Sequence, residues 1–421
     1  MPCFYAPVST RLLTYKVPHR MKPLHYYFIG TGAWFLAFGI QSVVFAWLVT
    51  IVLAESPTMV GFAQMAFLMP AMLLMLVGGS LADQFGGRRM ALIGHLLATI
   101  APLFLVVTIL LDQFSYMLLL VFAIIIGCSQ ALVTPARDGL LVQVADGRIQ
   151  QRVVQVSMIQ FGIQMLGFVI ASFADRLGAV VILSLQSAFL FAGAVAFYRL
   201  KLPFEAPVRH SNKMLQQIAA SIVEGYHSVR QSPHMTAVVI QNCAMGVFFM
   251  GSYIVAIPLL IREVYAGSSM ELSLVNGANA LGLVLTVLFL MRVGDIKRQG
   301  RALLISQGLG SICLLGCGLG LGFASLLPFV FAWGLCGGIA MTMSRTVMQE
   351  QAPENQRARM MSFYSFSFMG AGPIGALLSG VLVDFFGASV ALIICPICML
   401  LVSIYMSIKS PLWKLGTTRT S

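Results

Sequence analysis

The chain has 421 residues, of which 59% are hydrophobic and 10% are charged. Soluble domains carry about 25% charged residues, so this composition excludes an ordinary soluble protein and indicates an integral membrane protein. A helix needs about 20 apolar residues to cross a bilayer, so the length allows roughly a dozen spans joined by short loops. The apolar runs are long and continuous, which excludes the alternating strands of an outer-membrane barrel.

In chain order, residues 1–25 form a basic tail without the apolar core and cleavage site of a secretory signal. Six spans follow, and the polar linker 201–234 separates them from six more. The predicted spans are 26–53, 58–81, 89–111, 116–136, 153–174, 178–199, 235–261, 271–292, 301–323, 325–345, 360–383 and 387–408. We therefore expect an N-terminal bundle over 26–200, a C-terminal bundle over 235–408 and a cytoplasmic tail over 409–421.

The charges test this order of spans, because basic residues concentrate in cytoplasmic loops. Of the 26 lysines and arginines, only Arg176 and Arg262 fall in loops predicted to lie outside. The outside loops also hold the acids Glu55, Asp112, Asp175, Glu263, Glu271 and Asp384. The net charge of +12 thus reflects orientation toward an anionic leaflet, without any role for nucleic acid. Both termini are predicted to be cytoplasmic.

The loop between the second and third spans combines small and charged residues. Residues 78–89 read Gly-Gly-Ser-Leu-Ala-Asp-Gln-Phe-Gly-Gly-Arg-Arg. This resembles the cytoplasmic loop signature of the major facilitator superfamily at Gly79, Leu81, Asp83, Gly86 and Arg89. Small residues let helix ends approach closely, and Asp83 can form charge-assisted hydrogen bonds with Arg88 or Arg89. Alternatively, the two arginines only orient the chain.

Two motifs recur at equivalent places in the halves. An aspartate and an arginine share one spacing in segments 83–89 and 295–301, each after the second span of its half. The sequence Asp-Arg-Leu-Gly at 175–178 also matches Asp-Phe-Phe-Gly at 384–387. Many transporters consist of two related halves. The chain is thus predicted to be an all-α polytopic membrane protein with twelve transmembrane helices in two pseudo-repeated six-helix halves, the major facilitator fold.

Further stretches resemble the bacterial enterobactin-exporter-like and drug-efflux-like branch of the superfamily. They are segment 349–359 with 370–380, and the run 46–61. Antiporters of the superfamily often carry a Gly-Pro-rich motif in span 5. Here Gly162 and Gly167 are present without the proline, and a Gly-Pro pair stands at 372–373 in span 11 instead. The branch resemblance implies export, and span 5 weakens that expectation.

Polar residues inside spans are candidates for substrate binding, because such residues usually face a bundle interior or a water-filled cavity. They are Gln41, Gln64, Gln130, Gln160, Gln164, Gln241, Asn242, Tyr253, Asn276 and Asn279. All are neutral, and the 25 methionines and 29 phenylalanines can form an adaptable apolar surface. An amphipathic organic substrate is therefore expected. For each amide, a hydrogen bond between helices is the alternative role.

Gating and proton coupling are expected at charged residues. The candidate cytoplasmic latch comprises Asp83, Arg88, Arg89, Asp295, Arg301, Arg357 and Arg359. No acid lies near the middle of a predicted span, so the coupling candidates are Asp83 and the intramembrane histidine, His95. A packing role is the alternative for His95. Asp175 and Asp384 are further coupling alternatives, for which structural hydrogen bonding is the competing role.

These features predict a secondary active transporter of a small drug-like or siderophore-like compound. The resemblance implies alternating access, outward transport, protons as the coupling ion, and a place in the bacterial inner membrane; we expect a monomer. The sequence has no metal-ligand cluster, phosphate-binding loop or nucleophile with a base, so neither an enzyme nor a cofactor is expected. The alternatives are an importer or symporter on the same fold, and a transport-dead sensor or assembly partner.

Overall fold

The computed structural model describes residues 22–145, 148–202, 226–227, 229–294, 296–352 and 357–415. Within these residues, 12 helices are long and apolar enough to cross a membrane. The predicted helical membrane fold is thereby confirmed. Asp295 lies outside the described residues, and so do the side chains of Asp83, Arg357 and Arg359.

The N-terminal half contains six long helices. They are α1 (Pro23–Trp47) with the π-helical turn η1 (Leu48–Val52), α2 (Pro57–Phe85), α3 (Gly87–Leu110), α4 (Tyr116–Val144), α5 (Ile149–Ala171), and α7 (Ala179–Arg199) after the short α6 (Ala174–Leu177).

The C-terminal half contains the other six spans, the first of which is built from several pieces. They are α9 (Pro233–Ala244) with η2 (Met245–Met250), η3 (Ser252–Ala256) and α10 (Ile257–Glu263), then α11 (Ser269–Val293), α12 (Gln299–Gly318), α13 (Phe323–Gln351), α14 (Arg357–Phe386) and α15 (Ala388–Lys409), followed by η5 (Pro411–Lys414).

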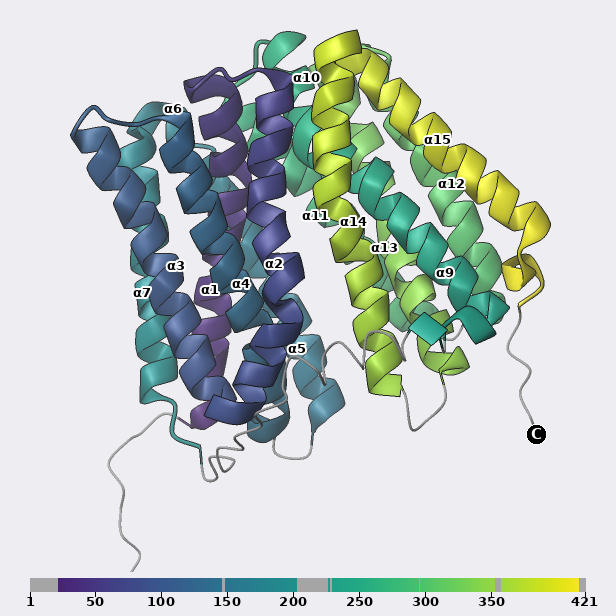
Figure 1. The fold of residues 1–421 in the computed structure, drawn as a ribbon, viewed down its shortest axis with the longest axis horizontal. Helices are drawn as coiled ribbons and strands as arrows, with labels where there is room; N and C mark the ends of the chain where they lie inside the picture. The colour runs from purple at the N-terminus through teal and green to yellow at the C-terminus, as the bar shows by residue number, and fades with distance from the viewer. Residues whose placement is uncertain are drawn as a thin grey trace, which may run out of the picture.

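The two halves repeat one packing scheme (Figure 1). In the first half, α1 packs on α5 and α7, α2 on α4, and α3 on α4 and α7. In the second, η2 packs on α14 and α15, α11 on α13, and α12 on α13 and α15. Between the halves, α2 contacts α14 and α5 contacts α11. The contacts between the halves are therefore related by the same pseudo-symmetry.

Two equivalent glycines end the fifth and eleventh spans. Gly178 has φ 82° and Gly387 has φ 81°, a left-handed conformation that glycine adopts without steric cost. At each of these glycines the chain changes direction sharply and then enters the next helix, α7 or α15. The matched sequence motifs at 175–178 and 384–387 thus form matched structures.

Close backbone contacts hold each half together. A Cβ added at Gly167 of α5 would lie 2.8 Å from the Cα of Gly39 in α1, and one added at Gly375 of α14 would lie 2.7 Å from the Cα of Val247. Small residues permit such approach between membrane helices. Gly167, in the span 5 stretch that lacks the proline, therefore has a packing role.

The fourth span is longer than predicted, because α4 continues through Pro135 to Val144. Proline removes a helical hydrogen bond and crowds the carbonyl four residues earlier, here that of Ala131. The backbone of Gly78 in α2 packs against this carbonyl. The helix thus continues past the proline at a point where it packs against α2. As a result, Arg137 lies inside the span and not in a loop.

The helix ends segregate by charge. One end of the molecule, called here the acidic end, holds Glu55, Asp112, Asp175, Glu263, Glu271 and Asp384. The opposite end, called the basic end, holds Lys22, Arg88, Arg199, Lys201, Arg301 and Lys409. In Figure 1, α6 and α10 mark the acidic end at the top.

Candidate functional site

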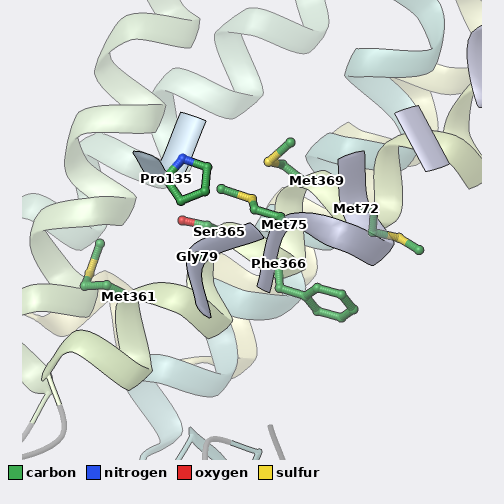
Figure 2. A pocket seen from close by; sticks show the side chains of 8 residues that line it. All are labelled: Met72, Met75, Gly79, Pro135, Met361, Ser365, Phe366 and Met369. Carbon is green, nitrogen blue, oxygen red and sulfur yellow. The ribbon is translucent and has the colours of Figure 1, made fainter. Parts of the chain in front are cut away.

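A cavity of about 360 Å³ lies between the two halves. Helices α2, α4 and α14 provide its lining, which consists of Met72, Met75, Gly79, Pro135, Met361, Ser365, Phe366 and Met369. Figure 2 shows Met75 and Met369 near Pro135, with Met72 and Phe366 to one side. The volume falls in the range of about 300–1,000 Å³ that small-molecule sites occupy.

The lining of this cavity is predominantly apolar. Its four methionines are flexible and polarizable, and thioethers make favourable contacts with aromatic rings. Ser365 supplies a side-chain hydroxyl, and Phe366 is 37% exposed. No charged side chain lies in the described lining. Such a surface suits an apolar or aromatic group of variable shape.

The cavity lies toward the basic end. Helix α2 starts at the acidic end, and Met72 and Met75 lie in its second half; α14 starts at the basic end, and Met361 and Met369 lie in its first half. Toward the acidic end the same two helices touch, because a Cβ added at Gly380 would lie 3.0 Å from the Cα of Gly61. The halves are thus closed on one side of the cavity.

Among the described residues, Asp175 makes an extensive polar contact between the halves. Its Oδ2 accepts hydrogen bonds from the backbone N–H of Ser269, at 2.7 Å, and from the hydroxyl of the same serine. Its Oδ1 accepts the indole N–H of Trp47 at 2.8 Å, a contact within the N-terminal half. Ser269 is the first residue of α11 and is fully buried. This contact joins the end of span 5 to the start of span 8.

The pseudo-equivalent residue, Asp384, makes a smaller contact at the same end. Its Oδ2 accepts a hydrogen bond of 2.7 Å from the hydroxyl of Thr58 in the first turn of α2. Nearby, Nη1 of Arg262 donates to the carbonyls of Thr50 at 3.2 Å and Glu55 at 2.7 Å, and so ties α10 to the first half. Together with Asp175, these residues close the acidic end.

The predicted polar residues of the first half lie mostly within helix contacts. The Nε2 of Gln186 in α7 donates to Oε1 of Gln41 at 2.7 Å, and both side chains are buried. Gln64 instead crosses between the halves, since its Nε2 donates to the carbonyl of Ile254 at 3.1 Å. The other three predicted residues of this half have half-buried side chains; they are Gln130, Gln160 and Gln164.

In the second half, Tyr253 donates its hydroxyl to Oδ1 of Asn276 at 2.8 Å. Gln241 and Asn242 are fully buried in α9, and both amide heavy atoms of Gln241 lack a hydrogen-bond partner. Asn279 packs its backbone against Gly334. None of the ten predicted substrate residues is among those that line the cavity.

Two described latch residues at the basic end, Arg88 and Arg301, make contacts within their own half. Arg88 donates from Nη1 to the carbonyl of Leu200 at 2.9 Å, and Arg89 is exposed at the start of α3. Arg301 donates from Nε to the carbonyl of Trp413 at 2.7 Å, and its guanidinium lies 5.3 Å from the centre of that ring. These contacts tie α3 to the end of α7, and α12 to η5.

His95 is enclosed by aromatic residues inside the first half. Its ring centre lies 5.1 Å from that of Trp34 and 5.0 Å from that of Phe197, and its Nδ1 lies 2.8 Å from the carbonyl of Ala91. The side chain is fully buried. These contacts support the packing alternative for this histidine.

Arg137 is a buried cation that sequence reasoning missed. The residue is 7% exposed, its guanidinium lies 4.5 Å from the ring centre of Phe35, and Nε and Nη1 have no hydrogen-bond partner. Its Nη2 lies 3.5 Å from Oδ1 of Asp138, whose side chain is exposed. Because the predicted span ended at residue 136, Arg137 was not among the sequence-based candidates inside the spans.

The cavity and the partner of Asp175 were also missed. The sequence signal for Asp175 existed in the repeated Asp-x-x-Gly motif, but nothing in the sequence showed that it meets Ser269 from the other half. The cavity has no local signature, since its methionines come from segments far apart in the chain.

Comparisons with known proteins agree with this architecture. A family model described as transmembrane secretion effector matches residues 18–419. An uncharacterized MFS-type transporter, YfiS of Bacillus subtilis (strain 168), is 26% identical over 374 residues, which are 84% of each chain. The multidrug efflux pump Tap of Mycolicibacterium fortuitum is 24% identical over 381 residues, 87% of this chain and 90% of Tap.

Solved structures share the fold at low identity. A POT family transporter in complex with 5-aminolevulinic acid superposes with a TM-score of 0.75 at 14% identity, covering 92% of this chain and 96% of that one. The nucleoside transporter NupG gives a TM-score of 0.68 at 12% identity, covering 91% and 98%. The family and its relatives are transporters, not enzymes. The chain therefore belongs to the transmembrane secretion effector family of the major facilitator superfamily, within its drug-efflux-like branch.

Proposed function

We propose that this protein exports amphipathic organic compounds across the bacterial inner membrane by alternating access, driven by proton antiport. The observation that carries the proposal is the methionine-lined cavity between the halves, together with the closed acidic end. In this conformation a compound reaches the cavity from the basic end. Opening of the acidic end would release it on the other side.

The distribution of charge supports an orientation that agrees with this direction. Basic residues mark the cytoplasmic face of membrane proteins, which supports the proposal that the basic end and both termini lie in the cytoplasm. A cavity open to the cytoplasm and closed outside is the state in which an exporter loads, and an importer releases its substrate in the same state. The similarity to a multidrug efflux pump supports the same direction.

The substrate class follows from the lining. Met75, Met369 and Phe366 offer an adaptable apolar surface, and Ser365 offers a hydroxyl for one polar group. A compound with an aromatic or aliphatic body and few charges would fit such a site. We propose drug-like compounds ahead of siderophores, because a polar, multiply charged chelator would lack partners among these residues.

A proton-coupling residue belongs to this proposal as well. The aromatic enclosure of His95 supports a packing role. Asp83 is then the first carboxylate to test, and substitution by asparagine should reduce transport while leaving folded protein in the membrane.

The test is a substitution that fills the cavity. Met75→Trp adds a bulky ring beside Met369 and Pro135, so cells that make this variant should accumulate fluorescent amphipathic compounds as if they lacked the protein. Met117→Trp is the matched control, because Met117 lies in the first turn of α4 at the acidic end and is 67% exposed. Export by the Met75 variant at the parent rate would remove the cavity from the pathway.

Uptake is the second candidate, because α5 lacks the proline that superfamily antiporters often carry in span 5 and runs without interruption from Ile149 to Ala171. In the same experiment, an importer would raise the accumulation of its substrate above that of cells without the protein. The cavity variant would then lower it.

A further inference from the structure

Two aspartates at the acidic end occupy equivalent positions but make unequal contacts. Asp175 follows the last turn of α5, and Asp384 lies in the last turn of the equivalent helix α14. Each reaches the first turn of the second long helix in the other half. Asp175 accepts from both the backbone N–H and the hydroxyl of Ser269, whereas Asp384 accepts from one hydroxyl. The carboxylate of Asp175 is thus held by more hydrogen bonds from the other half than the carboxylate of Asp384 is.

The start of α11 does not need Asp175 as a cap. Ser268 is the N-cap, and its side chain accepts from the backbone of Met270 at 3.3 Å. Glu271 completes a capping box, with Oε2 accepting the backbone N–H of Ser268 at 2.7 Å. A capping box already satisfies the helix terminus locally. The bond from Ser269 to Asp175 therefore joins the halves and can be released without unwinding α11.

The geometry of the carboxylate supports a strong contact. A helix N-terminus favours a negative charge, and hydrogen bonds to an ionised group are stronger than neutral ones. The backbone N–H of Asp175 also donates to the hydroxyl of Ser269 at 3.3 Å. Trp47 holds the other carboxylate oxygen from within the same half, so the side chain is aimed at α11.

We propose that Asp175 is the principal gate residue of the acidic end, a positioning residue whose bonds to Ser269 set the balance between the closed and open states. Asp384 is its weaker counterpart. The inference rests on the proposed alternating access and deepens it by naming the contact that must break for release. Its test measures opening directly, so it remains decisive even if no substrate is ever found.

Ionisation of the Asp175 carboxyl stabilises the closed state of the acidic end. Burial would raise its pKa, but hydrogen bonds from Ser269 and Trp47 outweigh that effect and hold the pKa below the usual value. Among described residues, Glu271 of α11 is bonded through its carboxylate to Ser268 and repels Asp175 electrostatically. Helix α6 itself carries Arg176, and α1 presents the neutral Trp47. A lowered pKa stabilises the closed state above the ordinary aspartate pKa of about 3.9, and this stabilisation is lost as pH falls through the lowered value.

The gate is therefore closed by an ionised Asp175 throughout the neutral range. It acts as a latch of constant strength between pH 6 and pH 8, which favours a structural role over proton coupling for this aspartate.

The experiment measures distance across the acidic end. Spin labels at Leu111 and Leu319, which are 62% and 61% exposed in equivalent loops of the two halves, report opening in reconstituted protein. The eight native cysteines are first replaced. The parent is expected to show one short distance, unchanged between pH 8 and pH 6. Asp175→Asn should raise the ratio of open to closed states tenfold or more, because its NH₂ group must face either the Ser269 N–H or the Trp47 indole N–H.

Asp384→Asn is the matched control. A hydroxyl can donate or accept, so Thr58 can still pair with the amide, and this variant should keep the parent distances. Ser269→Ala retains the backbone bond and should give an intermediate shift, which keeps the test valid if the Asp175 variant fails to fold. Parent distances in both Asp175→Asn and Ser269→Ala, or an equal shift in Asp384→Asn, would overturn the proposal.

Discussion

Helices α2 and α14 cross so closely at the acidic end that one methyl group should separate them. A Cβ added at Gly380 would lie 2.6 Å from the carbonyl oxygen of Pro57 and 3.0 Å from the Cα of Gly61. These are backbone atoms, which cannot rotate away as a side chain can. Gly380→Ala should therefore favour the open state of the acidic end, in which the two helices are apart.

The magnitude follows from the cost of overpacking. Inserting a methyl into a well-packed contact typically costs about 1–3 kcal/mol. At about 1.4 kcal/mol for each factor of ten, the ratio of open to closed states should rise roughly 5- to 150-fold. Because the substitution also favours the helix by up to about 1 kcal/mol, a glycine in open space is needed as the control.

The assay is the rate at which an impermeant maleimide modifies a cysteine at position 64. The side chain of Gln64 is 6% exposed and spans the halves, so Gln64→Cys is protected while the acidic end is closed. In this background Gly380→Ala should speed modification by the same 5- to 150-fold, roughly, because the rate follows the open population. Gly277→Ala in α11, where an added Cβ has no neighbour within 4 Å, should leave it unchanged. An unchanged rate for Gly380→Ala would refute the reasoning.

Three further substitutions test the polar contacts, each by thermal unfolding in detergent or by the accessibility assay. Arg137→Met removes a buried charge whose described carboxylate partner, Asp138, is exposed to solvent, so the melting temperature should stay the same or rise; a clear fall would show that the contact is stabilising. Gln186→Leu leaves Gln41 unpaired and should cost about 1–3 kcal/mol, which the double substitution with Gln41→Leu should largely restore. Thr58→Val removes the single hydrogen bond to the exposed carboxylate of Asp384, so modification at position 64 should change less than about fivefold.

The helices were largely predictable because each span is a long apolar run bounded by charged or glycine-rich turns. The exception, α4, shows the limit of that reasoning. Thr134-Pro135 followed by Arg137 and Asp138 is typical of a helix end, yet the helix continues for two more turns. A local pattern contains no information about Gly78 of α2, which packs against the carbonyl that the proline crowds.

The site was less predictable, for a geometric reason. Sequence reasoning anticipated an adaptable methionine and phenylalanine surface, and the cavity has one; it could not tell which methionines face the cavity. Met72 and Met369 belong to helices almost 300 residues apart in sequence whose facing sides depend on tertiary packing. The sequence-based candidates were polar residues instead. One of them, Gln41, forms a hydrogen bond with Gln186 inside one half and does not line the cavity.

Proton-driven export through the methionine-lined cavity can be measured directly in inside-out membrane vesicles whose lumen has been acidified, with a pH-sensitive dye inside. Addition of a transported compound should raise the luminal pH in vesicles with the parent protein, and should not do so with the Met75→Trp variant. Movement of the compound without any change in luminal pH, or an equal response from the variant, would contradict the account.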